Sequence, residues 1–204
     1  MNIISNNCLG GFVYKEVLQM PYSNPLIWHA FVNPQEYSSF IKDFDKLNFE
    51  NIMLSKEGYG LNNNFIIEID EKYKIFQHHM FFDANATTPT AFGPNGNNIK
   101  YNRIWEYIID NFIRRTERME TEKNVLVLFY DPYNQIKNHQ EIVDAITYKN
   151  YNGLVFSNQK LDLSKKINQL QVCDNWANEE YGWHSSFMNK HKESIKKIIS
   201  DLDK

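Results

Sequence analysis

One stretch constrains the fold of this chain more than any other, the apolar run Val125-Leu126-Val127-Leu128-Phe129-Tyr130, which ends at Asp131-Pro132. A strand with one face in water alternates apolar and polar residues, whereas a strand buried on both faces is apolar throughout. The run therefore predicts a central strand covered on both sides, with a polar residue at its carboxyl end.

Strand and helix patterns alternate around this run. The first apolar residues, 2–5, lead through a tight loop into residues 12–18, whose apolar side chains recur at helical spacing. Strands are also predicted over 153–156 and 170–173. Further helices are predicted over residues 34–47, 102–119, 140–148, 163–169 and 185–202. This alternation predicts an α/β fold with a mainly parallel sheet in a three-layer α/β/α sandwich.

Residues 49–82 follow a different pattern. The segments 52–54, 65–69 and 73–79 have strand-like alternation and no helix between them, which predicts an antiparallel insertion or sheet extension. The long irregular segment 83–100 follows. Long loops in compact domains are often functional, so we expect a mobile lid beside the site. An ordered surface loop packed by Phe92, or a subunit contact, is the alternative.

Composition excludes several classes of protein. With 204 residues, 42% of them hydrophobic, 23% charged and a net charge of −3, the chain is expected to form one globular domain over 1–204. The mildly acidic balance counts against a nucleic-acid partner. No apolar stretch approaches the ~20 residues of a spanning helix, and the N-terminus lacks the pattern of a signal peptide. We expect a cytoplasmic protein without an integral membrane segment, or one peripheral at the inner membrane.

The loop from Asn6 to Gly11 is the first candidate site, since open α/β sheets bind ligands at the carboxyl ends of their strands. It contains Cys8, and a thiol near a helix N-terminus is stabilised as the thiolate. The amides of Gly10 and Gly11 could donate to an oxyanion or a phosphate, and Asn6 and Asn7 could bind substrate. The alternative is a packed cysteine in a tight turn whose glycines supply positive φ.

A cysteine nucleophile needs a base. His78 and His79 lie at the end of a predicted strand, where one ring faces opposite to the other. His184 is the rival base, with Asp174 as a possible orienting residue. Each histidine could instead be a structural or surface residue.

Two arginines could hold an anion. Arg114 and Arg118 share one face of the predicted helix 102–119 and could bind a carboxylate or phosphate, although a solvated face paired with Glu117 and Glu120 fits equally. Asp43 and Asp45 diverge on a helix, which argues against a metal-nucleotide site. No cofactor-binding motif and no metal-ligand spacing is found, so we predict neither a cofactor nor a metal.

The same residues carry a resemblance to a known family. The run Ile3-Ile4-Ser5-Asn6-Asn7-Cys8-Leu9-Gly10-Gly11, the turn Met20-Pro21-Tyr22-Ser23-Asn24-Pro25 and the helix start Asn33-Pro34-Gln35-Glu36 resemble a bacterial domain family of unknown function often described as exopolysaccharide biosynthesis proteins. Members carry a later W-x-R-R-x-x-R segment, which residues 112–118 match except that Phe112 replaces the tryptophan. The resemblance implies a role in cell-surface polysaccharide or capsule assembly.

A weaker resemblance is to a papain-like cysteine peptidase family of bacteria, through the order Cys8, His78 or His79, and Arg114/Arg118 before the apolar strand. The signature around the papain cysteine is absent. Three functions follow as expectations. The first is a Cys8-dependent acyl or group transferase acting on a glycan precursor, with His79 as base. The second is a non-catalytic or glycosyltransferase-like binder of a nucleotide sugar, and the third is a papain-like cysteine hydrolase.

Overall fold

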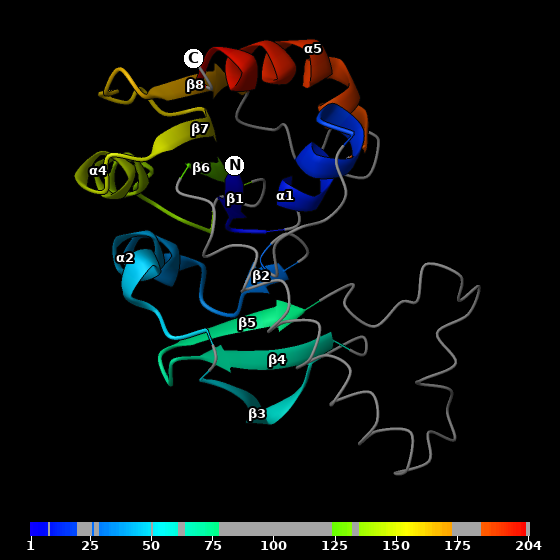
Figure 1. Ribbon diagram of the computed structural model, residues 1–204, viewed down its shortest axis with the longest axis vertical. Helices are drawn as coiled ribbons and strands as arrows, with labels where there is room; N and C mark the ends of the chain where they lie inside the picture. Colours follow the sequence, from blue (N-terminus) through cyan, green and yellow to red (C-terminus); the bar gives the residue numbers. More distant parts are fainter. Residues whose placement is uncertain are drawn as a thin grey trace.

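The computed structural model describes residues 1–7, 9–19, 26, 29–49, 51–60, 64–77, 124–131, 135–172 and 185–202. Within these segments the chain forms two four-stranded sheets (Figure 1). One sheet is parallel and the other antiparallel, which confirms the predicted α/β class.

The parallel sheet has the order β1-β6-β7-β8, with β1 at Asn2–Ser5, β6 at Val125–Tyr130, β7 at Asn152–Ser157 and β8 at Ile167–Gln171. All three strand pairs are parallel. Every residue of β6 is buried, as the continuous apolar run predicts.

Alternate side chains of β6 enter two different hydrophobic cores. Leu126, Leu128 and Tyr130 pack with the segment formed by α1 (Leu9–Phe12) and the π-helix η1 (Val13–Val17), and with α5 (Ser185–Leu202). Val127 and Phe129 pack with α2 (Tyr37–Asp43) and α4 (Gln140–Tyr148). The parallel sheet is therefore covered by helices on both faces, as predicted.

The antiparallel strands form a sheet of their own, in the order β2-β5-β4-β3. The strands are β2 (His29–Phe31), β3 (Ile52–Gly60), β4 (Asn64–Ile69) and β5 (Tyr73–Gln77). Helix α2 lies between the two sheets in Figure 1, and its Phe40 and Ile41 share one core with Ile67 of β4 and Val127 of β6. The predicted antiparallel region thus packs on the parallel sheet through α2.

The helix predicted over 34–47 is confirmed as three consecutive helical pieces. A 3₁₀ turn, η2 (Pro34–Glu36), precedes α2, and a second, η3 (Phe44–Lys46), follows it. Asn33 caps the start, since its side-chain oxygen accepts a hydrogen bond from the Gln35 amide at 3.2 Å. Pro34 occupies the first helical position, where its missing N–H costs nothing.

Three sequence predictions differ from the structure. The helix predicted over 163–169 is absent: residues 158–166 form no helix, and β8 starts at Ile167, earlier than the predicted strand 170–173. Leu163 and Ile167 have helical spacing, but Leu163 is exposed and Ile167 belongs to the sheet.

The first helix begins at Leu9, earlier than predicted, and continues as a π-helix. The Leu18 amide closes it by donating a hydrogen bond to the Val13 carbonyl at 2.9 Å.

None of the helices in the described segments combines the length and the apolar character that crossing a bilayer requires.

Candidate functional site

The carboxyl ends of β1 and β6 form the candidate site. These strands are neighbours in the parallel sheet, yet the helix that follows β1 packs on one face and the helix that follows β6 packs on the other. Where adjacent strands send the chain to opposite faces, open α/β sheets bind their ligands.

Asn6 and Asn7 connect the two strands at this edge. The Asn6 side chain donates to the Tyr130 carbonyl at 2.9 Å and accepts from the Tyr130 amide at 3.0 Å. The Asn7 side-chain amide donates to the same carbonyl at 2.7 Å. The side chains of Asn6 and Asn7 therefore fix the segment leading into Cys8 to the end of β6. Their predicted role in binding substrate stays a prediction.

The start of α1 uses its own amides. The Asn7 side-chain oxygen accepts from the Leu9 amide at 3.0 Å, and the Ser5 hydroxyl accepts from the Gly10 amide at 3.2 Å. Gly10 and Gly11 are both buried, and neither has a positive φ. The Gly10 amide, one of the predicted oxyanion donors, is thus already engaged within the protein.

Asp131 is a buried carboxylate directly after β6, only 3% exposed. One of its oxygens accepts from the Gln135 amide at 3.0 Å and the other from the Ile136 amide at 2.6 Å. Burial alone would raise the pKa of Asp131, but interaction with His139 and the bonds from the Ile136 and Gln135 amides outweigh it and lower the pKa. The charged carboxylate therefore holds the segment that follows β6.

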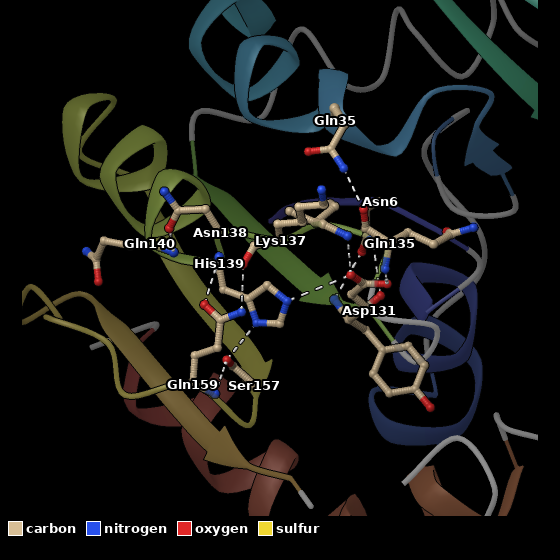
Figure 2. A network of polar contacts seen from close by, with 12 residues as sticks. Asn6, Gln35, Asp131, Gln135, Lys137, Asn138, His139, Gln140, Ser157 and Gln159 are labelled. Atoms are coloured by element: carbon tan, nitrogen blue, oxygen red, sulfur yellow. Dashed lines mark hydrogen bonds and ion pairs between the residues drawn. The ribbon is translucent and has the colours of Figure 1, made fainter. Parts of the chain in front are cut away.

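His139 lies between Asp131 and Ser157 (Figure 2). Its Nδ1 is 2.7 Å from the Ser157 hydroxyl oxygen, and its Nε2 is 3.7 Å from an Asp131 carboxylate oxygen. Among the described residues, no hydrogen-bond partner satisfies Nε2. Since the Gln159 amide donates to the Ser157 hydroxyl oxygen at 3.0 Å, that hydroxyl can donate its own proton to Nδ1, leaving the ring proton on Nε2, facing Asp131.

This Asp131-His139-Ser157 chain resembles a catalytic triad in composition but not in access. The three residues are 3%, 2% and 0% exposed, respectively. A nucleophile must reach its substrate. Because the Ser157 hydroxyl is fully buried, it cannot act as one. The Asp131-His139-Ser157 network can hold and orient a proton inside the protein.

The remaining predicted site residues lie outside the described part of the chain. They are Cys8, His78, His79, His184, Asp174, Arg114, Arg118 and the loop 83–100. Their predicted roles stay predictions. Cys8 is flanked by the described residues Asn7 and Leu9, both of which belong to the hydrogen-bonded edge.

Sequence reasoning did not single out His139 or Ser157. A signal exists for Ser157, which ends a buried strand in the same way that Asp131 follows β6. His139 has the weaker signal of directly preceding a predicted helix. Within the described segments, no three histidine, cysteine, aspartate or glutamate side chains gather as a metal-binding group.

Comparison with known proteins adds one match. No curated protein and no solved structure matches the chain. Residues 1–88 match the model of a domain of unknown function, DUF1919. The matched region contains β1, the Cys8 loop, α2 and the antiparallel strands. This confirms the likeness of the N-terminal part to an uncharacterised domain family.

Proposed function

We propose that the protein transfers an acyl group to a precursor of a cell-surface polysaccharide, with Cys8 as nucleophile and the carboxyl ends of β1 and β6 as the site. One observation carries the proposal: Asn6 and Asn7 hold the segment entering Cys8 against Tyr130, where the helices after β1 and β6 cover opposite faces. Open α/β sheets place reactive groups at such an edge.

The substrate class comes from the resemblance of residues 3–37 and 112–118 to exopolysaccharide biosynthesis proteins. In the proposed reaction, the Cys8 thiolate attacks the acyl carbon of an activated donor, and a thioester forms as the donor's leaving group departs. A sugar hydroxyl of the acceptor then attacks the thioester, loses its proton to the base and restores the thiolate. His79 or His78 is the proposed base, while Arg114 and Arg118 hold an anionic part of the substrate.

The hydrogen bonds at the start of α1 count against a nucleotide-sugar binder, and they also leave the Gly10 amide unable to serve as an oxyanion donor in the proposed transferase. A diphosphate bound at this loop would need several backbone donors, and the amides of Leu9 and Gly10 already donate to Asn7 and Ser5. A hydrolase would use the same thioester with water as acceptor, so the acceptor is what separates hydrolase from transferase.

Alkylation tests the nucleophile. In a Cys173→Ser background, iodoacetamide should modify Cys8 near neutral pH faster than a free thiol, whose pKa is about 8.5. After incubation with acyl-coenzyme A donors, the intact mass should rise by one acyl group, and Cys8→Ser should abolish that rise. If iodoacetamide modifies Cys8 no faster than a free thiol and nucleotide sugars raise the melting temperature, the protein is a nucleotide-sugar binder and not an acyl transferase.

A further inference from the structure

We infer that His139 is a positioning residue for this site: anchored by Ser157, its ring lies against Asp131 and thereby supports the end of β6 to which Asn6 and Asn7 bind. Its link to Cys8 rests on the proposed function. Figure 2 shows the chain of contacts from Ser157 through His139 to Asp131, with Asn6 at the same edge.

The first step concerns the peptide group between Tyr130 and Asp131. Its carbonyl oxygen accepts hydrogen bonds from both Asn6 and Asn7. The orientation of this single peptide group therefore sets the position of both asparagines, which directly precede Cys8 in the chain.

The second step concerns the other side of that peptide group. Asp131 binds the amides of Gln135 and Ile136 with its two oxygens, and His139 Nε2 faces one of these oxygens at 3.7 Å. The Gln135 carbonyl in turn accepts from the Gln35 side chain, which precedes α2. Movement of Asp131 would thus reach the β1 edge and the segment before α2 together.

The third step is the fixation of the imidazole ring. Ser157 holds Nδ1, the Gln159 amide holds the Ser157 hydroxyl, and the Phe129 ring packs edge-on against the imidazole at 4.9 Å between centroids. Because the side chains of His139 and Asp131 are each 3% exposed, neither meets substrate, and their effect on the site is one of position.

Two amide variants separate the two ends of the ring. In His139→Gln the longer side chain brings an amide group to the place of Nε2, where it can donate to Asp131. In His139→Asn the shorter side chain reaches only the place of Nδ1, beside Ser157. Ser157→Ala removes the anchor at the Nδ1 end of the ring. The matched control is His29→Gln, which changes a fully buried histidine of β2 in the same way.

Hydrogen exchange and alkylation are the two readouts. In His139→Asn and in Ser157→Ala, the Gln135 and Ile136 amides should exchange about tenfold faster than in the wild type, and the pH profile of Cys8 alkylation should shift. His139→Gln should keep both close to wild type. The control should leave exchange at residues 135–136 unchanged.

Three outcomes would overturn the inference. The first is equal behaviour of the Asn and Gln variants, and the second is unchanged exchange at residues 135–136 in both His139→Asn and Ser157→Ala. The third applies when Cys8 is reactive in the wild type: amide exchange at residues 135–136 becomes faster in the variants, but the pH profile of Cys8 alkylation does not change. If wild-type Cys8 reacts no faster than a free thiol, the proposed function fails, and exchange at residues 1–7 in the same variants decides whether His139 positions the β1 edge.

Discussion

In the parallel sheet, β6 buries every side chain, whereas β5 of the antiparallel sheet alternates buried Tyr73 and Ile75 with the partly exposed Lys74 and Phe76. A strand buried on both faces has no room for polar groups along its length, so they gather where it ends. The difference explains why Asn6, Asp131 and Ser157 lie at the carboxyl ends of β1, β6 and β7, while Glu68 and Lys74 pair along the partly exposed face of the antiparallel sheet.

Two aspartates illustrate the contrast. Asp43, at the end of α2, accepts hydrogen bonds from Lys72 and, at 2.7 Å, from Tyr73, and these bonds lower the pKa of Asp43. Burial and the Asp43 contact raise the pKa of Tyr73 to about 12. Because Lys72 is exposed and Asp43 is partly exposed to solvent, their ion pair contributes little, on the order of 0–1 kcal/mol. Asp131 is buried, so its hydrogen bonds to the Gln135 and Ile136 amides contribute more to the free energy of unfolding.

The largest effect is expected from Phe129→Ala in β6. The ring is fully buried, stacks on Tyr37 at 6.4 Å and touches His139, so its loss should reduce the free energy of unfolding by about 3–5 kcal/mol. Urea unfolding followed by circular dichroism measures it. Because both sheets share this core, a single transition is expected. Two separate transitions would show that the sheets unfold independently and would contradict the single domain that the sequence predicts.

Asp131→Asn should rank next, with a loss of about 1.5–3 kcal/mol at neutral pH, because a buried charged acceptor of two backbone amides is removed. The folded pKa of Asp131 lies below its unfolded value of about 3.9, so its charge stabilises the fold above about pH 4 and this contribution is lost as pH falls through the folded pKa. The variant should therefore lose less stability between neutral and acid pH than the wild type. Asp43→Asn, at the end of α2, is the control because Asp43 bonds to Lys72 and Tyr73 of the antiparallel sheet. An equal effect there would remove the contrast between the two aspartates.

Gly153→Ala should cost about 1 kcal/mol, at the lower end of the range for overpacking. A methyl group on Gly153 of β7 would stand 3.2 Å from atoms of Ile146 and Ile167, which lie on α4 and β8. Ile146→Val in the same chain should restore part of the loss, as thermal unfolding of the single and double variants would show. Additive losses in the double variant would mean that the contact with Ile146 is not the cause.

The smallest effect belongs to the β4–β5 hairpin. Asp70 and Glu71 both have a φ of 54°, a left-handed backbone that costs about 1–2 kcal/mol for residues with a Cβ. Glu71→Gly relieves this strain at an entropic cost of about 0.5–1 kcal/mol, so a net gain of about 0.5 kcal/mol is expected. The melting temperature measures it. A lower melting temperature would show that the Glu71 side chain stabilises the turn in a way its backbone does not reveal.

Much of the fold follows from the sequence because burial requires apolar residues at regular spacing along helices and strands. The run at 125–130, the helix over 140–148 and the helix over 185–202 are found at the predicted residues. The helix predicted over 163–169 was wrong because four-residue spacing of two apolar residues cannot distinguish a short helix from a loop that enters a strand.

The site was less predictable because its contacts join residues far apart in the chain. Position at the end of the first strand led to Asn6 and Asn7, yet nothing in the sequence shows that their amides bind Tyr130. His139 has no neighbour in sequence that indicates a buried role, since its side-chain contacts come from Asp131, which follows β6, and Ser157, which ends β7.

The pairing of β1 with β6 also has a consequence for synthesis on the ribosome. Asn6 bonds to Tyr130, 124 positions further along, and the whole antiparallel sheet lies between them in the chain. At about 5–20 residues per second, the first strand waits roughly 6–25 s before its neighbour has been made. During that interval Ile3 and Ile4 of β1 have no sheet to enter, so the nascent β1 segment is an expected binding site for chaperones that recognise short apolar stretches. The antiparallel sheet can form before the strand that precedes the Cys8 loop is in place.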